Sequence, residues 1–190
     1  MTPVFIIGLG NPEPEYTGTR HNAGRYFVKL FAKKFGFPEF AHAKKVALVS
    51  EGKIGKRAII LILPETYMNN SGKAAVLLKV KKEMPNIVVV NDDIDLPLGK
   101  FKIVYNRGSG GHRGVESLRR ALKTEAFVRL RIGIAPKKKP NHKELLTFLT
   151  SKFKPTEAEA LKKISKKVME ALELVIAEGH EAAMNKFNKG

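Results

Sequence analysis

The amino-acid sequence predicts an α/β fold: a single domain in which a twisted mixed β-sheet is flanked by helices, with a C-terminal amphipathic helix. Short apolar runs, typical of buried strands, alternate along the chain with segments whose apolar residues recur at helical spacing. A hairpin-like pair of strands makes the expected sheet mixed. The length of 190 residues, 43% of them hydrophobic, suits one domain over residues 1–190.

The N-terminal half of the chain predicts three strands, a hairpin turn and two helices. The first helix carries an apolar stripe from Ala23 to Phe31 and is expected to end at Gly36. Asn70 or Ser71 is expected to cap the second helix. The expected ranges are 4–7, 46–50 and 58–63 for the strands, 51–56 for the turn, and 74–78 for the apolar part of the second helix.

The C-terminal half predicts three more strands and three more helices. The strands are expected at 87–90, 101–105 and 128–134, with a glycine-rich loop at 107–114 and shorter helices at 115–122 and 143–148. Pro155 precedes the long amphipathic helix, in which Thr156 and Glu159 have capping-box spacing. Gly179 is the expected end of this helix.

The charge of the chain is strongly positive. Thirty-five Lys and Arg residues against eighteen Asp and Glu residues give a formal net charge of +17. A folded domain with this imbalance carries large basic surfaces, whose usual partners are polyanions such as nucleic acid. The alternative is a lysine-rich surface that only favours solubility.

The composition also excludes several classes of protein. The chain has no cysteine, which rules out disulfides, thiolate-ligated metals and a thiol nucleophile. No segment approaches the roughly 18 consecutive apolar residues of a membrane span. The first expected strand lies so near Met1 that we expect no signal or transit peptide, and therefore a cytoplasmic protein.

Three loops follow apolar strands at their carboxyl ends, over residues 8–21, 64–69 and 91–95. In open α/β sheets, ligands bind outside the carboxyl ends of the strands. If these three strands are parallel, their loops meet at one edge of the sheet. That edge would then carry four polar side chains: Asn11, His21, Asn69 and Asp92.

His21 is the best candidate for a catalytic residue. It precedes an expected helix, whose N-terminus disfavours the charged imidazolium and keeps the ring neutral, as a general base requires. Asp92 could accept a hydrogen bond from the other ring nitrogen, fix the tautomer and stabilise the imidazolium as it forms. The alternative is a structural loop histidine. Asn11 and Asn69 could likewise be only a turn residue and a helix-start residue.

Other catalytic chemistries have less support. Gly8-Leu9-Gly10 resembles the start of a dinucleotide-binding loop, but Glu13 occupies the position of the third glycine. The chain has neither a phosphate-binding Gly-Lys-Ser/Thr loop nor a Gly-x-Ser-x-Gly elbow. The five histidines do not have the spacing of a metal site. His21 would therefore most simply activate water.

The basic residues form two groups in the sequence. One surrounds the expected site edge, and its arginines near the glycine-rich loop are the better phosphate ligands because a guanidinium binds phosphate through two hydrogen bonds. Its members are Lys102, Arg107, Arg113, Arg129 and Arg131. The other group is lysine-rich and comprises residues 137–139 and the lysines at 162, 163, 166 and 167. Any single lysine among these could equally be a solvated surface residue.

Several sequence blocks resemble those of the bacterial-type peptidyl-tRNA hydrolase family. The longest is Gly8-Leu9-Gly10-Asn11-Pro12 followed by Tyr16 and by Thr19-Arg20-His21-Asn22-Ala23-Gly24. Further blocks, in the same order, are Pro64-Glu65-Thr66-Tyr67-Met68-Asn69, Asp92-Asp93-Ile94-Asp95-Leu96-Pro97, Gly108-Ser109-Gly110-Gly111-His112 and Arg129-Leu130-Arg131-Ile132-Gly133-Ile134. Because the blocks spread over most of the chain, they are far more specific than any one glycine motif.

The resemblance implies an enzyme that hydrolyses the ester between a peptide and the 3′-terminal ribose of tRNA. It implies a monomer without metal or organic cofactor. It assigns His21 as the catalytic base and Asp92 as its orienting carboxylate. The implied substrate-binding residues are Asn11, Tyr16, Tyr67, Asn69 and Arg113, and the implied ligands of the tRNA phosphate are Lys102, Arg107 and Arg131.

One position departs from the family pattern, because Arg113 stands where the family usually has asparagine. An arginine side chain cannot accept a hydrogen bond, but it can donate to a phosphate or a carbonyl group. Two other functions remain open: a non-catalytic RNA-binding relative on the same fold, and a hydrolase of small esters or peptides. The intact His21 and Asp92 argue against the first, and the basic charge argues against the second.

Overall fold

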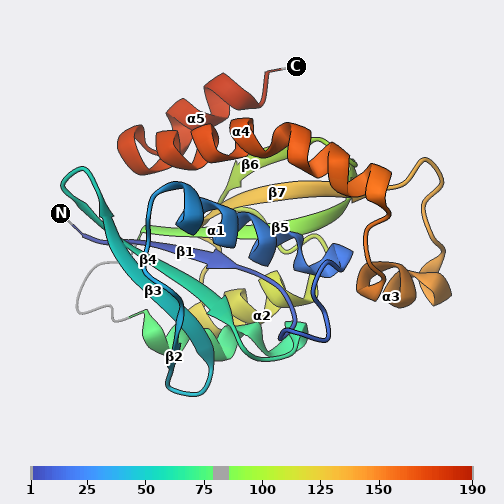
Figure 1. Cartoon of the computed structure of the whole chain (residues 1–190), viewed down its shortest axis with the longest axis horizontal. Helices are drawn as coiled ribbons and strands as arrows, with labels where there is room; N and C mark the ends of the chain where they lie inside the picture. Colours follow the sequence, from blue (N-terminus) through green and yellow to red (C-terminus); the bar gives the residue numbers. More distant parts are fainter. Residues whose placement is uncertain (1, 79–85, 190) are drawn as a thin grey trace.

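The computed structural model describes residues 2–78 and 86–189, which form a seven-stranded sheet covered by helices on both faces (Figure 1). The predicted fold class is confirmed. The elements are β1 Val4–Gly8, η1 Arg20–Asn22, α1 Ala23–Lys34, β2 Ala41–Ala43, β3 Ala47–Ile54, β4 Arg57–Pro64, η2 Met68–Leu77, β5 Asn86–Pro97, β6 Phe101–Tyr105, α2 Arg113–Leu122, β7 Val128–Ala135, α3 His142–Thr150, α4 Pro155–Glu178 and α5 His180–Phe187, where η marks a 3₁₀ helix.

The sheet is mixed, with strand order β2-β3-β4-β1-β5-β7-β6. The central strand β1 is parallel to β4 on one side and to β5 on the other, and β5 is parallel to β7. The pairs β2–β3, β3–β4 and β6–β7 are antiparallel. Because β1, β4 and β5 are parallel, the segments that follow them emerge at the same edge of the sheet, as the sequence predicts.

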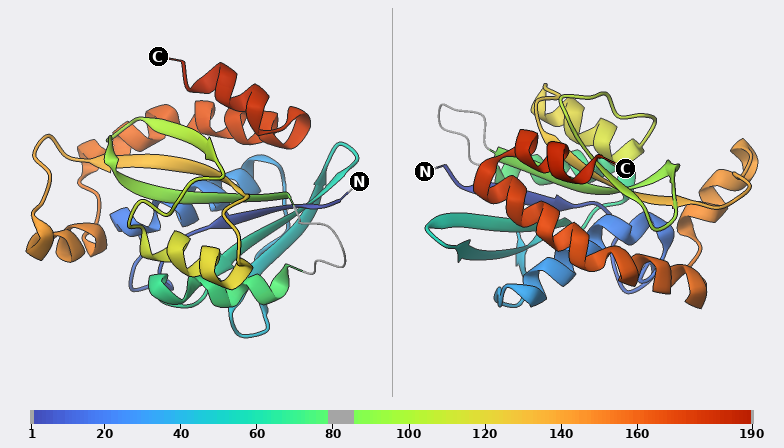
Figure 2. Two further views of the ribbon diagram at one scale, coloured as in Figure 1. Left: turned by 180° about the vertical axis from the view of Figure 1, so that it is seen from behind. Right: turned by 90° about the horizontal axis from the view of Figure 1, so that it is seen from above.

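Side chains of β1 alternate between two hydrophobic layers. Val4 and Ile6 face the layer that α1, α4 and α5 cover, whereas Phe5 and Ile7 face the layer that η2 and α2 cover. Figure 2 shows these two helical layers from behind and from above. A strand buried on both faces reads as a continuous apolar run, which is why the sequence predicts it. No helix among the described residues has the length and apolar character needed to cross a membrane.

α1 approaches the centre of the sheet at Gly24. A Cβ atom at this position would lie 2.1 Å from the carbonyl oxygen of Val90 in β5, well inside van der Waals contact. We therefore expect Gly24→Ala to lower the free energy of unfolding by about 3 kcal/mol or more, because backbone must shift to relieve the overlap. Urea unfolding measures this effect. Gly108→Ala is the control, since no atom lies within 4 Å of its added Cβ, and an equal loss in both variants would contradict the close packing at Gly24.

Some element boundaries differ from the sequence prediction. Residues 91–95, predicted as a loop, belong to β5, which runs from Asn86 to Pro97. The polar half of β5 is held extended by backbone pairing to β7, where Asn91, Asp92 and Asp93 pair with Arg131, Ile132 and Gly133. Pairing to β1 ends at Val90. Asp92 is therefore fixed on a strand at the point where one side of that strand no longer pairs with β1.

The predicted caps were also wrong. η2 begins at Met68, and no side chain caps it, so neither Asn70 nor Ser71 has that role. α4 begins at Pro155, and the backbone N–H of Lys154 donates to Glu157 at 2.7 Å, in place of the predicted pairing of Thr156 with Glu159. The predicted end of α4 at Gly179 is confirmed. The sequence analysis missed β2 and α5, which are short, and placed the hairpin turn too broadly, because β3 extends to Ile54 and β4 starts at Arg57.

Candidate active site

The structure brings His21 and Asp92 into direct contact at the carboxyl edge of the sheet. His21 lies in η1, and its Nδ1 atom is 3.0 Å from Oδ1 and 2.9 Å from Oδ2 of Asp92. Both residues are buried. A carboxylate only accepts, so Nδ1 of His21 carries the hydrogen and donates it. The Nε2 atom of His21 is then the unprotonated nitrogen that can act as a base.

Arg20 anchors the short helix that presents His21. Its Nη1 atom donates to the carbonyl oxygens of Ser151 at 3.2 Å and Lys152 at 3.0 Å, and to the Ser151 hydroxyl at 2.7 Å. Its Nη2 atom donates to Glu157 at 2.5 Å. Arg20 is itself buried, and its guanidinium lies 4.4 Å from the centre of the Phe148 ring. The residue before the candidate base is thus tied to the segment that joins α3 to α4.

His112 is a third member of the site, to which the sequence analysis assigned no role. Its Nε2 atom lies 2.9 Å from Oδ1 of Asp92, and its ring centre is 5.1 Å from that of His21. Its Nδ1 atom accepts hydrogen bonds from the backbone N–H groups of Gly114 and Val115 at 3.2 and 3.3 Å, which makes His112 the N-cap of α2. The available signal was a polar residue three positions before the helix predicted at 115–122.

The hydrogen bonds of the two ring nitrogens of His112 fix its tautomer. Because Nδ1 accepts from two backbone N–H groups, the ring hydrogen is on Nε2 and is donated to Asp92. Asp92 therefore receives one hydrogen bond from each histidine. Two histidines and one aspartate are also residue types of a metal site, and their ligand atoms lie within 4.8 Å of one another. However, a protonated Nε2 on His112 has no lone pair for a metal, so the geometry fits a carboxylate with two donors better.

The two histidines also control the charge of Asp92. Burial by itself would raise the pKa of Asp92, but the charges and hydrogen bonds of His21 and His112 outweigh burial and hold this pKa well below its usual range. Asp92 is therefore a carboxylate throughout the neutral pH range. A permanent anion beside Nδ1 of His21 stabilises the imidazolium that forms when Nε2 takes a proton.

Asn11 links the first two loops of the edge. Its Oδ1 atom accepts from the backbone N–H of Met68 at 2.7 Å. Its backbone N–H donates to Oδ1 of Asn22 at 2.8 Å, and its carbonyl oxygen accepts from Nδ2 of Asn22 at 3.0 Å. Asn11 is buried and belongs to the site edge as predicted. Since its Oδ1 atom is occupied, the amide group of Asn11 is left to offer N–H donors to a ligand.

Three predicted substrate-binding residues lie at the start of η2 and beside it. Tyr67 is 59% exposed, and its ring meets that of Tyr16 edge to face with centres 6.4 Å apart. Asn69 is exposed in the first turn of η2, immediately after the Met68 residue that Asn11 binds. The structure therefore leaves Tyr67 and Asn69 exposed at the second loop, and the half-buried Tyr16 meets Tyr67 from the first loop.

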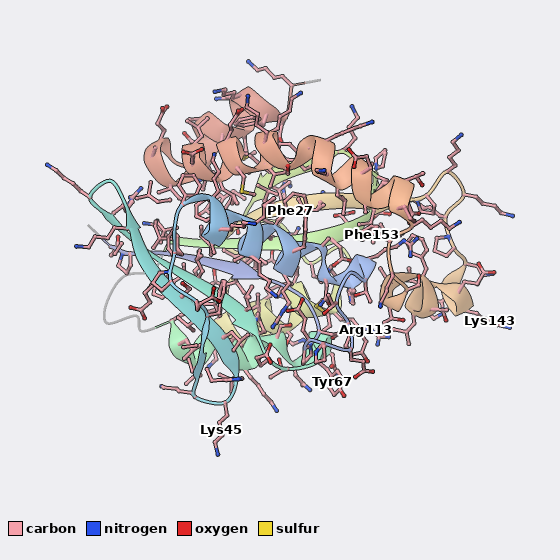
Figure 3. All side chains as sticks on the ribbon, in the orientation of Figure 1. Phe27, Lys45, Tyr67, Arg113, Lys143 and Phe153 are labelled. Atoms are coloured by element: carbon pink, nitrogen blue, oxygen red, sulfur yellow. The ribbon has the colours of Figure 1, made fainter. Side chains whose placement is uncertain are left out.

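Arg113 is exposed at the first position of α2, directly after His112 (Figure 3). The backbone at Gly114 packs so closely on η2 that a Cβ atom there would lie 2.4 Å from the sulfur of Met68. This contact places the start of α2 against the second loop, so Arg113 and Tyr67 lie at the same rim, as Figure 3 shows. No hydrogen bond or ion pair joins the Arg113 guanidinium to another residue in the described part of the chain.

The predicted phosphate ligands gather around a separate cavity of about 620 Å³. Lys102 of β6 and Arg131 of β7 are paired neighbours, and Arg107 joins them in the cavity wall. The Nε atom of Arg131 is hydrogen-bonded to Asp93. Arg129 also lines this cavity but has a structural role, because its guanidinium is buried and donates to the carbonyl oxygen of Gly108 at 2.6 Å.

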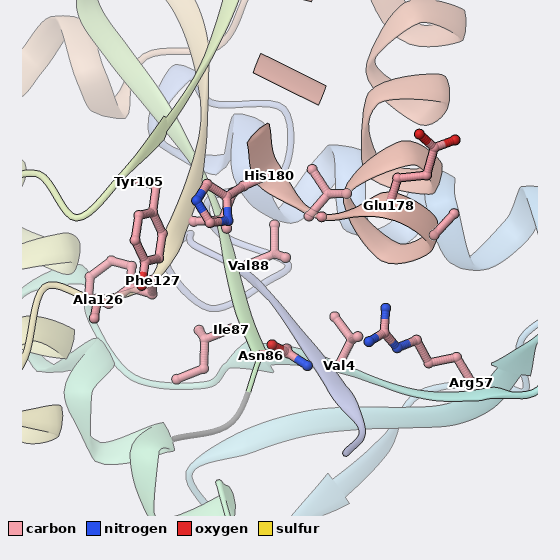
Figure 4. Close-up of a pocket in the computed structure, with 14 residues that line it drawn as sticks. Val4, Arg57, Asn86, Ile87, Val88, Tyr105, Ala126, Phe127, Glu178 and His180 are labelled. Carbon is pink, nitrogen blue, oxygen red and sulfur yellow. The ribbon is translucent and has the colours of Figure 1, made fainter. Parts of the chain in front are cut away.

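Another cavity, of about 400 Å³, lies at the opposite edge of the sheet (Figure 4). Its wall includes Val4 and Asn86, the first residues of β1 and β5, together with Arg57 and His180. None of the predicted site residues lines it. In open α/β sheets the carboxyl edge is the functional edge, so the site at His21 is the stronger candidate.

Comparison with known proteins gives a consistent result. The family model for peptidyl-tRNA hydrolase matches residues 5–190. A peptidyl-tRNA hydrolase of Mycobacterium tuberculosis (strain ATCC 25177 / H37Ra) is 37% identical over 188 residues, which cover 98% of this chain and 97% of the relative. One from Synechococcus sp. (strain JA-2-3B'a(2-13)) is 38% identical over 188 residues, covering 97% of this chain and 82% of the relative.

A solved structure agrees with the sequence relatives. The crystal structure of peptidyl-tRNA hydrolase from Acinetobacter baumannii superposes with a TM-score of 0.87 at 29% identity, and the match covers 98% of this chain and 95% of the other. The family model spans nearly the whole chain, and the relatives share more than a third of its residues. The chain therefore belongs to the peptidyl-tRNA hydrolase family.

Proposed function

We propose that residues 1–190 form one catalytic domain that hydrolyses the ester bond between the peptide and the 3′-terminal ribose of peptidyl-tRNA. The observation that carries this proposal is the buried hydrogen bond from Nδ1 of His21 to Asp92, at 2.9 Å, which leaves Nε2 free as a base. Family membership and the net charge of +17 support a tRNA substrate. Hydrolysis of such esters would recycle tRNA from unfinished translation products.

In the proposed reaction His21 acts first as a base and then as an acid. Nε2 takes a proton from water while the water oxygen forms a bond to the ester carbonyl carbon. The bond from that carbon to the ribose oxygen then breaks, and the His21 imidazolium returns its proton to the leaving ribose oxygen. The products are a free peptide acid and a tRNA with its ribose hydroxyl restored. Asp92 stabilises the positive charge on His21 between the two steps.

The proposal assigns substrate binding to the polar groups around the second loop. Asn11 and Asn69 place the carbonyl group and the developing oxyanion through N–H donors. Tyr16 and Tyr67 border the same region. Arg113 donates to a phosphate or carbonyl oxygen near the 3′ end of the tRNA, since its guanidinium has only donors.

The tRNA phosphate is assigned to Lys102, Arg107 and Arg131. Three such contacts predict that affinity falls about 20- to 40-fold between 50 and 200 mM salt, because each contact releases counterions from the RNA. We expect Lys102→Ala to make the slope of log affinity against log salt shallower by about one. Fluorescence-detected tRNA binding across a salt series measures this slope. Lys53→Ala is the control, because Lys53 is exposed on β3, near the opposite end of the strand order from the Lys102 strand β6. An equal change of the slope in both variants would contradict the assignment.

The experiment that tests the proposed function is hydrolysis of N-blocked aminoacyl-tRNA by the purified protein. Release of free tRNA is the expected result. Binding of tRNA without any cleavage would favour the alternative, a non-catalytic RNA-binding protein on the same fold. Equal cleavage of short N-blocked aminoacyl esters without tRNA would favour a small-ester hydrolase instead. We also propose that the protein is a monomer and that it acts in the cytoplasm.

A further inference from the structure

A buried guanidinium lies beneath the first two loops of the site and takes no part in the proposed chemistry. It belongs to Arg25, in the first turn of α1, and Arg25 is only 1% exposed. An ionised side chain is costly to bury unless it is paired and hydrogen-bonded. The partners of Arg25 show what this buried charge accomplishes.

Arg25 joins the two loops that carry the substrate-binding asparagines. Its Nη1 atom donates to the carbonyl oxygen of Pro64 at 2.8 Å, and its Nη2 atom is hydrogen-bonded to Glu65, at the start of the second loop. Its Nε atom lies 3.5 Å from a carboxylate oxygen of Glu13, in the first loop. Its own backbone N–H donates to the carbonyl oxygen of Leu9 at 2.9 Å. Arg25 thus contacts both loops.

The cluster around Arg25 is electrically balanced. Lys29, one turn further along α1, pairs with Glu13 at 2.5 Å. Two cations therefore face two carboxylates, Glu13 and Glu65, which are themselves about four-fifths buried. Removal of the guanidinium alone would leave Glu65 without its partner and Glu13 with Lys29 alone. Such a loss is usually strongly destabilising, whereas an apolar replacement of a whole buried pair is often tolerated.

The cluster lies close in sequence to the groups proposed to bind substrate. Glu13 is two residues after Asn11, and Glu65 is two residues before Tyr67. The hydrogen bond from Met68 N–H to Asn11 crosses between the same two loops. By contrast, the contacts of Arg25 do not include His21 or Asp92. Arg25 is placed to control where the substrate sits, without altering the base that activates the attacking water.

We propose that Arg25 is a positioning residue that holds Asn11 and Asn69 at the separation that peptidyl-tRNA requires. This inference rests on the proposed function. Without the guanidinium, the two loops lose their shared anchor, and the ester carbonyl is no longer held over the water that His21 activates. A misplacement of about 1 Å can reduce the rate about 10²-fold. The pH dependence set by the His21–Asp92 pair remains unchanged.

The test compares Arg25→Met with the double variant Arg25→Met/Glu65→Gln. The single variant is expected to lose both stability and activity. In the double variant one unpaired carboxylate has been neutralised, so the melting temperature recovers toward that of the wild type. The kcat/KM for N-blocked aminoacyl-tRNA is nevertheless expected to stay about 10²-fold below the wild-type value, with KM raised at least tenfold. Arg25→Lys is expected to rescue little, because an ammonium group lacks the planar fork that reaches both loops.

Two further measurements separate positioning from a general loss of structure. The acid limb of the pH profile of kcat/KM is expected to keep its midpoint in the double variant, because His21 and Asp92 are untouched. Lys34→Met is the control for loss of a cation from α1, since Lys34 pairs only with the exposed Glu173 at 2.9 Å among the described residues. Its kinetic constants are expected to match those of the wild type.

A stable double variant with wild-type KM and kcat would overturn the positioning role while leaving the hydrolase function intact. A shifted acid limb would also overturn it, because it would mean that Arg25 acts on the His21–Asp92 pair. An inactive wild type would overturn the proposed function and with it this inference. The two failures are therefore distinguishable in one series of measurements.

Discussion

His21→Ala is expected to lower kcat for N-blocked aminoacyl-tRNA about 10³- to 10⁴-fold. The variant removes the Nε2 atom that takes the proton from water and later returns it to the ribose oxygen, and both steps depend on that atom. Binding of tRNA is expected to change little, because the proposed phosphate ligands Lys102 and Arg131 belong to a separate cavity. Single-turnover hydrolysis, together with tRNA binding, measures the two effects separately.

His42→Ala is the matched control for that experiment. His42 lies exposed on the edge strand β2, far along the sheet order from His21. Its replacement is expected to leave kcat and tRNA binding unchanged. A His21→Ala variant that retained kcat within tenfold of the wild type would contradict the role of His21 as the base. Loss of tRNA binding in the same variant would show a structural role instead.

Asp92→Asn is the second change with a large expected effect, a loss of about 10²- to 10⁴-fold in kcat. The carboxylate accepts one N–H from His21 and one from His112, and the tautomer of His112 is fixed by its cap on α2. An amide has a single oxygen, which His112 would retain, so the NH₂ group would face Nδ1 of His21. His21 would then have to accept at Nδ1, which moves its hydrogen to Nε2 and removes the lone pair that the base needs.

The tautomer itself can be observed. ¹⁵N chemical shifts of the His21 ring are expected to show the hydrogen on Nδ1 in the wild type and on Nε2 in Asp92→Asn. Asp95→Asn is the control, because Asp95 is exposed further along the same strand and pairs with Lys139 at 2.8 Å. An unchanged His21 tautomer combined with a large loss of kcat would contradict this explanation.

The same carboxylate gives a pH dependence whose sign follows from its lowered pKa. A carboxyl group with a lower pKa in the folded state stabilises the fold above its unfolded pKa, which is about 3.9 for aspartate, and loses this contribution as the pH falls toward the folded value. The wild type is therefore expected to exceed Asp92→Asn in free energy of unfolding near pH 6, by a margin that shrinks below about pH 4. Urea unfolding at both pH values measures the margin.

The lowered pKa of Asp92 also bears on the pH dependence of kcat/KM. Because the pKa of Asp92 lies well below its usual range, the acid limb of kcat/KM is not expected to report protonation of this carboxylate. A wild-type acid limb with its midpoint below about pH 4, where carboxyl groups ordinarily titrate, would contradict this expectation.

Local chemistry explains why much of the fold could be predicted from the sequence. The strand β1 is a short apolar run, β6 and β7 have apolar residues at alternate positions, and α1 and α4 carry apolar stripes. Each of these patterns is visible within a few neighbouring residues. Because ligands bind at the carboxyl ends of the strands in open α/β sheets, the sequence also predicted that His21 and Asp92 lie at the same edge of the sheet. Where polar residues continue a strand, as Asp92 does in β5, the local pattern predicts a loop, because only pairing with β7 holds that segment extended.

The sequence by itself determined the residue types, the charge, the buried strands and the edge on which the site lies. Only the tertiary structure decided which side chains meet there. His112 reaches Asp92 from 20 residues away, and Arg25 reaches Pro64 from 39 residues away. These contacts depend on strand order, on the close approach of α1 at Gly24 and on the packing of α2 against η2. Such long-range geometry results from the burial of the whole core, so no local window of the sequence contains it.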